Sequence, residues 1–158
     1  MKKVTIKETK RCDTRALVKN FTKEDVKKDT IAHIAAVQNV TASFASALID
    51  QVANHDSTKL GEYLPMFTRA LKTKFKDDEF KKLNWWKIHK RSERHHLNDY
   101  CPDDVNLIDV IEMLIDCVCA GLARTGNVYP IEISDNMLQK AVANTVAMLK
   151  ESIEIEKE

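Results

Sequence analysis

Three acidic residues interrupt the most apolar stretch of the sequence, residues 105–123. Asp109, Glu112 and Asp116 stand at positions i, i+3 and i+7, so a helix would place them on one face. An isolated buried carboxylate costs several kcal/mol of stability unless it is paired, protonated or bound to a metal ion. The spacing therefore predicts compensating partners for these acids.

The histidines are the natural partners, because all five lie in or at the ends of segments with helical spacing: His33, His55, His89, His95 and His96. Imidazole together with carboxylate is typical of sites for Mn, Fe, Co, Ni or Zn, and less typical of sites for Mg alone. His55 and Asp56 are adjacent in "NHDSTKL", so both can reach one ion only where the backbone leaves the helix. We expect that loss of regularity over residues 54–57.

The spacing of the histidines leaves two questions open. His95 and His96 would point about 100° apart on a helix, and the seven-residue spacing from His89 favours His96 as the one that faces a site. A straight helix over residues 33–55 would separate His33 from His55 by roughly 33 Å. A reversal near residues 40–46 would bring His33 and His55 to the same end, where they could share one ion. Without that reversal, His89, His95 or His96 must take the place of His33 as a ligand.

The composition favours helices to position these residues. The chain has 158 residues, 44% of them hydrophobic, with only three glycines and three prolines to mark turns. We predict an all-α, single-domain bundle of about five to six helices.

Helical spacing and capping residues place the expected elements along the chain. Residues 1–22 form an N-terminal arm, in which "KVTIKE" alternates like a short strand, and residues 23–153 form the helical domain. The first helix should begin near residue 23, after the Thr22/Asp25 capping pattern. Others are expected over 66–75 and 78–91, over the apolar segment that ends at Gly126, and after Ser134. The apolar segment should be the central helix, and residues 154–158 a solvated tail.

Charge is divided along the chain. Residues 1–28 and 69–94 each carry ten Lys/Arg against four acids, whereas residues 95–158 carry four against twelve. A positive rim around an acidic centre suits an anionic substrate. Because acids interrupt residues 105–123 and the N-terminus lacks the apolar core of a signal peptide, we expect a cytoplasmic protein that does not engage a membrane.

Four blocks of the sequence, in order, resemble the HD-domain superfamily of metal-dependent phosphohydrolases: "HIAAVQ", "HDSTKL", "WWKIHKRSERHH" and "VNLIDVIEMLIDCVCAG". Within it, they are most similar to a small phage and bacterial family. The resemblance covers about residues 30–125. It implies an HD-like helical domain, one or two divalent metal ions and, for a phage-encoded chain, a place in the host cytoplasm.

The resemblance also implies roles for individual residues. His33, His55, Asp56 and Asp116 would bind a first metal, and His89 with His95 or His96 a second. Lys59 would neutralise phosphate or brace the aspartate, and Glu62 and Glu112 would orient or deprotonate the attacking water. Arg94, and beside it Arg91, would contact phosphate. Glu93 and Cys117 depart from the family pattern, which favours Asn and Trp there.

The leading functional prediction is a metal-dependent phosphohydrolase that acts on a nucleotide or a short nucleic acid through metal-activated water. One alternative is a non-catalytic, metal-stabilised protein that binds nucleic acid or a host protein. Another is a di-iron oxygenase on the same scaffold. An intact ligand set favours chemistry, and a visible-region absorption with iron would favour the oxygenase.

Overall fold

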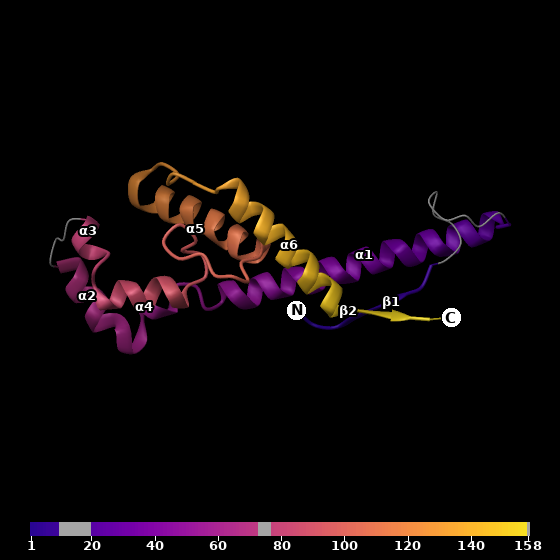
Figure 1. The fold of residues 1–158 in the computed structure, drawn as a ribbon, viewed down its shortest axis with the longest axis horizontal. Coiled ribbons are helices and arrows are strands. Elements are labelled where there is room, and N and C mark those ends of the chain that lie inside the picture. Colours follow the sequence, from indigo (N-terminus) through magenta and orange to yellow (C-terminus); the bar gives the residue numbers. More distant parts are fainter. Residues whose placement is uncertain (10–19, 73–76, 158) are drawn as a thin grey trace. The chain divides into compact units, whose positions relative to one another are not determined.

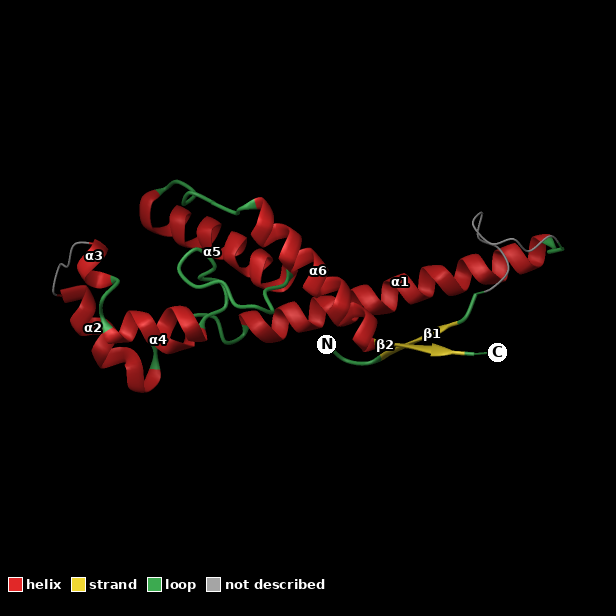
Figure 2. Cartoon of the chain, viewed as in Figure 1, coloured by secondary structure: helices red, strands yellow, loops and turns green. Residues whose placement is uncertain are grey.

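The computed structural model describes residues 1–9, 20–72 and 77–157. It is mostly helical, with one two-stranded sheet, which confirms the all-α class (Figures 1 and 2). Contacts divide the chain into two compact units, residues 1–49 with 146–158 and residues 50–145, and each is described separately. The residues expected to form one helical domain, 23–153, are thus shared between both units.

The first unit contains most of α1 (Lys23–Val52). The helix begins as predicted, because the Thr22 backbone N–H donates to Asp25 Oδ2 (2.9 Å) and the Asp25 N–H donates to Thr22 Oγ1 (3.2 Å). The helix is continuous through residues 40–46. The reversal considered for His33 is therefore wrong, since the segment has no residue that breaks helical hydrogen bonding.

A small parallel sheet completes this unit. Strand β1 (Val4–Lys7) pairs with β2 (Ile153–Glu156) (Figure 2). In the register, Val4 lies opposite Ile153. The alternation in "KVTIKE" is confirmed as a strand. Residues 154–157 are exposed, as expected of a solvated tail, but the sequence analysis did not predict their strand. The partner of β2 lies almost a whole chain length away, and local periodicity does not report such pairing.

The second unit contains the shorter helices and the residues of the candidate site. After the single turns η1 (Ser57–Lys59) and η2 (Gly61–Tyr63) come α2 (Leu64–Lys72), α3 (Asp77–Phe80) and α4 (Asn84–Ser92). α2 corresponds to the helix predicted over 66–75, of which residues 73–75 lie outside the described chain. The helix predicted over 78–91 is interrupted, because Leu83 has extended backbone angles (φ −63°, ψ 140°) that end the helical pattern.

Helix α5 (Leu107–Thr125) carries the three acids, and α6 (Asp135–Ser152) follows it. Helix α5 ends at Gly126, as predicted, and Gly126 has a left-handed conformation (φ 76°). Asn106 caps the start of α5 together with Asp109, which the sequence analysis did not predict. The helix was expected to be the central one, and the structure buries it on one face only. Ile115, Val118 and Leu122 are 45%, 38% and 52% exposed, so only one face of α5 enters the core.

The core of the second unit forms between the buried face of α5, the segment before it and α6. Its buried residues are Leu97, Val105, Val110, Met113 and Ala141. The Leu107 backbone N–H also donates to Thr145 Oγ1 on α6 (2.9 Å). This packing fixes the face of α5 on which Asp109, Glu112 and Asp116 lie.

One helical run, within residues 23–72, is long and apolar enough to cross a membrane by length and composition alone. Its most apolar 18-residue window has a mean hydropathy of 1.2, and none of that window is buried. The expectation of a chain that does not engage a membrane stays a prediction.

Candidate metal centre

The turn after α1 presents two neighbouring side chains to one place. The helix ends at Val52, and Asp56 adopts a left-handed backbone conformation with φ 57° and ψ 20°. Few residues other than glycine occupy this region, because Cβ then crowds the backbone. The irregularity predicted over residues 54–57 is confirmed, and it lets His55 and Asp56 approach the same partners.

Glu93 holds this turn in place. Its carboxylate is buried and accepts hydrogen bonds from the Asp56 N–H (3.0 Å), the Thr58 N–H (3.0 Å), the Thr58 hydroxyl (2.8 Å) and the Ser57 hydroxyl (3.3 Å). Such charge-assisted bonds stabilise a strained backbone. The sequence analysis noted Glu93 only as a departure from a family pattern and missed this role.

Two groups of ligand atoms meet at Asp56. The first contains His55, Asp56 and His95, and the second contains Asp56, His89 and His96. In the first, the Nε2 atoms of His55 and His95 lie 3.6 and 3.7 Å from oxygens of Asp56.

In the second group, His89 Nε2 lies 3.5 Å from Asp56 Oδ1 and 2.7 Å from His96 Nε2. Both neighbours, His95 and His96, therefore face the cluster, one in each group. Only one of the pair was expected to face a site unless the helix ended by Arg94, and α4 ends at Ser92.

The donor atoms fit a metal ion. Ligand bonds of about 2.0–2.2 Å around one ion place neighbouring ligand atoms roughly 3–3.6 Å apart, close to the separations from Asp56. Asp56 Oδ1 and His95 Nε2 are buried and have no hydrogen-bond partner within the described residues. Unpaired buried polar atoms are costly, so a cation between them would remove a penalty. These buried His/Asp groups could hold a metal ion.

Asp116 lies at the edge of the first group. Its Oδ1 atom is 3.4 Å from His55 Nε2, and its side chain is half-buried on α5. Asp116 belongs to neither of the two ligand groups, so its sharing of an ion with His55 and Asp56 stays a prediction.

Glu112 orients the histidines of the first group. Its carboxylate lies 2.9 Å from His55 Nδ1 and 3.3 Å from His95 Nδ1, and it accepts a hydrogen bond from Gln51 Nε2 (2.7 Å). Burial raises the pKa of Glu112, but the bonds from His95, Gln51 and His55 outweigh it and lower the pKa to about 2.

With its Nδ1 atom toward an ionised carboxylate, each of these histidines keeps Nε2 for an ion. The Glu112 side chain is almost fully buried. The geometry therefore gives it a positioning role rather than the expected contact with water.

A parallel arrangement orients His89. The Thr58 hydroxyl lies 2.5 Å from His89 Nδ1 and donates its one hydrogen to Glu93 Oε1, so it can only accept from His89. This network assigns the proton of neutral His89 to Nδ1 and leaves the Nε2 lone pair for an ion.

The protonation of the histidines suits ligation. Burial, followed by the charge of Lys59, lowers the pKa of His89 to about 4, and burial, followed by His95 and His89, lowers the pKa of His96 to about 3. Both rings are therefore neutral at pH 7, the form in which imidazole can bind a metal ion. For His55, burial lowers the pKa, but Glu112, Asp56 and Asp116 outweigh it and raise the pKa. An ion at Nε2 of His55 would replace a proton.

Lys59 pairs with Asp56 Oδ2 across one turn of η1. Burial raises the pKa of Asp56, but the Lys59 ammonium outweighs it and lowers the pKa. Of the two roles expected for Lys59, bracing the aspartate agrees with this contact.

Asp109, the first of the three acids, has partners of its own. Arg94 donates to it through Nε (2.7 Å) and Nη2 (2.8 Å), and Gln51 Nε2 donates a further bond (2.9 Å). The Arg94 guanidinium also contacts Asp104. The hydrogen bonds to Asp109 raise the pKa of Arg94. Arg94 therefore braces α5 and is not free to bind phosphate as expected.

Three further predicted residues lie outside the two ligand groups. Arg91 is exposed on α4, and Glu62 is exposed on η2. His33 lies on α1 in the first unit, which is described separately from the cluster. Because α1 is unbroken, the replacement of His33 by later histidines is the alternative that agrees with the geometry.

Fold and site together define a helical protein with a His/Asp cluster able to bind metal. The chain belongs to the family of unknown function DUF5662, whose model matches residues 22–155. No curated protein and no solved structure matches this chain.

Proposed function

We propose that this chain is a metal-dependent phosphohydrolase that acts on a phosphate ester of a nucleotide or short nucleic acid. The observation that carries the proposal is that Asp56 is common to two groups of ligand atoms. Asp56 and the histidines of the two groups would hold one or two ions, and a pair of ions would supply the charge that stabilises the attacking and leaving oxygens in phosphoryl transfer. The resemblance of the four sequence blocks to HD-domain phosphohydrolases supports the same reaction class.

The metal ions would supply the Lewis acidity that makes water nucleophilic near neutral pH and neutralises phosphoryl charge. The histidine-rich donor set favours Mn, Fe, Co, Ni or Zn over Mg. Glu112 and Glu93 would hold the ligands in place before substrate arrives, because they fix His55 and the Asp56 turn. Preformed ligands reduce the reorganisation that the reaction requires.

Lys59 would act on the substrate side of the cluster. Its ammonium group pairs with Asp56. If a cation were bound by that carboxylate, the ammonium would be available for a phosphate oxygen, where a positive charge would stabilise the negative charge that develops on the leaving group. Lys59 would then serve both roles expected from the sequence, bracing the aspartate and neutralising phosphate.

The test combines metal analysis with phosphate release. Purified protein supplied with Mn²⁺ would be assayed against nucleotides, cyclic dinucleotides and single-stranded DNA, with one product assay for each. We expect Asp56→Ala to abolish turnover and metal binding while far-UV circular dichroism stays unchanged. Asp50→Ala is the matched control, because Asp50 is an exposed aspartate six residues earlier.

The proposal fails if the protein binds metal but turns over no member of the panel, or if Asp56→Ala retains wild-type turnover. A visible absorption band that appears with iron, without phosphate release, would instead favour the oxygenase considered in the sequence analysis.

A further inference from the structure

A cleft of about 530 Å³ opens beside the ligand groups within the second unit. Aromatic and apolar side chains form most of its wall: Phe67, Leu71, Phe80, Trp85, Trp86 and Tyr129. Small-molecule sites commonly have this size and combine apolar walls with a few polar groups. The cleft thus has the dimensions and the lining of a ligand site.

The polar groups of the cleft connect it to the candidate metal centre. Lys59, His96 and Asp116 line it as well, and all three belong to or touch the ligand cluster. Arg124 adds a positive charge from the last turn of α5, and within the described chain its guanidinium has no ion pair. A ligand in this cleft would therefore meet the metal centre and a free cation at once.

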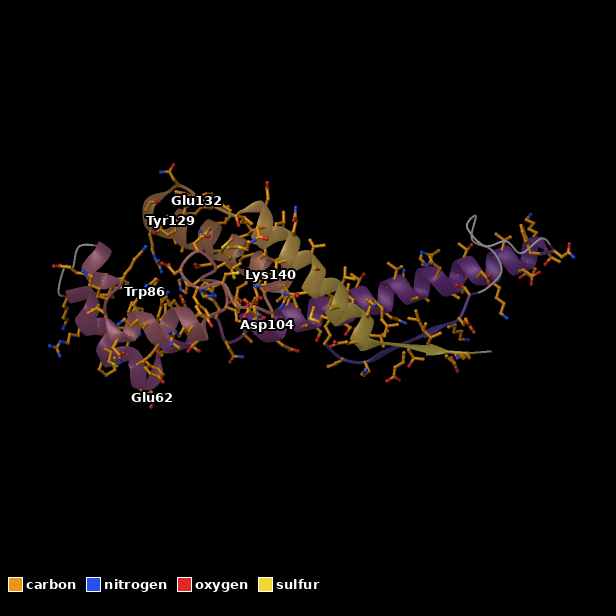
Figure 3. The ribbon with its side chains drawn as sticks, in the orientation of Figure 1. Glu62, Trp86, Asp104, Tyr129, Glu132 and Lys140 are labelled. Carbon is orange, nitrogen blue, oxygen red and sulfur yellow. The ribbon has the colours of Figure 1, made fainter. Side chains whose placement is uncertain are left out.

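The aromatic wall is held in shape by its surroundings. Trp85 lies between Phe67 and His89, each with ring centroids 4.8 Å away, and its Nε1 donates to the Thr58 carbonyl (3.1 Å). Trp86, labelled in Figure 3, is half-buried. Its ring centroid lies 5.0 Å from that of His96. Trp85 is therefore a fixed packing residue, and Trp86 is the tryptophan that a ligand can reach.

Tyr129 reaches the cleft because the loop after α5 lies directly on that helix. The Tyr129 backbone N–H donates to the Cys117 carbonyl (3.2 Å). A Cβ atom on Gly121 would lie 2.5 Å from both Asn127 O and Tyr129 N, so only glycine permits this approach. The backbone of Tyr129 is thus held against α5.

We infer that this cleft binds the planar aromatic ring of a phosphate monoester whose phosphate lies at the ligand groups. Planar aromatic rings stack favourably on aromatic side chains, whereas a sugar phosphate without an aromatic ring would leave the apolar wall in contact with water. Arg124, which lines the same cleft, would pair with the phosphate. The position of the phosphate rests on the proposed function, whereas binding of the aromatic ring does not rest on it.

The two tryptophans make ring binding directly measurable. The sequence has only two tryptophans, Trp85 and Trp86, and both line the cleft, so all indole fluorescence reports from its wall. The purified chain would be titrated with AMP, adenosine, phosphotyrosine and ribose 5-phosphate. We expect AMP to quench this fluorescence saturably, and to bind at least about tenfold more tightly than ribose 5-phosphate, which lacks only the base.

Variants separate the wall and the cation from general effects. Tyr129→Ala should weaken AMP about tenfold and ribose 5-phosphate little, whereas Arg124→Ala should weaken both phosphates and leave adenosine unchanged. Lys87→Ala removes an exposed charge of α4 that does not line the cleft, so it should change the affinity for neither AMP nor ribose 5-phosphate. Saturable quenching by phosphotyrosine but not AMP would support ring binding and assign it to aryl phosphates.

Equal affinity for AMP and ribose 5-phosphate, or no quenching by any ring-bearing probe, would overturn the inference. If the rings bind but no phosphate is released from any substrate, the proposed function falls and the ring site stands. If ribose 5-phosphate is hydrolysed as fast as AMP and no aromatic ring binds, the ring site falls and the proposed function stands.

Discussion

Replacement of Glu93 by glutamine tests whether one buried carboxylate sets the geometry of the metal centre. In the native chain, Oε2 accepts from the Asp56 N–H, and Oε1 accepts from Ser57 and Thr58. Glu93→Gln keeps the shape but leaves one oxygen. If the remaining oxygen accepts from Thr58, the new NH2 group faces the Asp56 N–H. Both groups are donors, so the hydrogen bond to the Asp56 N–H is lost.

The size of the effect follows from these contacts. A lost hydrogen bond to a charged group costs about 1.5–3 kcal/mol, and the remaining three bonds weaken because their acceptor is neutral. We therefore expect the free energy of unfolding to fall by roughly 2–4 kcal/mol. For a chain of this length, Tm should fall by roughly 5–15 °C.

Metal affinity should fall with stability, because the same turn carries Asp56 and the Thr58 hydroxyl that orients His89. Loss of such supporting bonds typically weakens metal binding about 10- to 100-fold. Differential scanning calorimetry and Mn²⁺ or Zn²⁺ titration calorimetry would measure both effects. Glu132→Gln, at an exposed glutamate, is the control. The reasoning is refuted if Glu93→Gln melts and binds metal as Glu132→Gln does.

Two further predictions concern the histidines. Glu112→Gln should weaken metal binding about 10- to 100-fold, because His55 and His95 lose the carboxylate that orients them; affinity equal to wild type in titration calorimetry would argue against that role. In metal-free protein, the unfolding free energy should fall as the pH drops from 6.5 toward 4.

The sign follows from the lowered pKa values of His89 (about 4) and His96 (about 3), because between those values and 6.5 the unfolded chain binds more protons. The slope should reach at most about 1.4 kcal/mol per pH unit for each histidine, and the raised pKa of His55 acts only above pH 6.5. Urea titrations at several pH values would measure the slope, and a flat profile would count against neutral buried histidines.

The sequence predicted those features that local chemistry decides. Thr22 and Asp25 marked the start of α1, Gly126 marked the end of α5, and the adjacency of His55 and Asp56 required an irregular turn. Each depends on residues within one or two turns of helix. The pattern alone was therefore sufficient to locate them.

Features that depend on distant partners could not be read in the same way. Arg94 seemed available for phosphate, but it is engaged by Asp109, fifteen residues away. Glu93 received no role because its partners lie in the turn after α1, more than thirty residues earlier. Trp85 and Trp86 are adjacent and chemically identical, and only the packing of Phe67 and His89 decides that Trp85 is the buried one.

The sharing of Asp56 has a consequence for how the centre would fill. Both ligand groups draw on one side chain in a backbone conformation that is costly for a residue with a Cβ atom. The first cation to arrive would immobilise that side chain, so the second would find the turn already ordered and an acceptor with less negative charge. Occupancy of the two positions would then be coupled, and a binding isotherm should depart from that of two independent, identical sites.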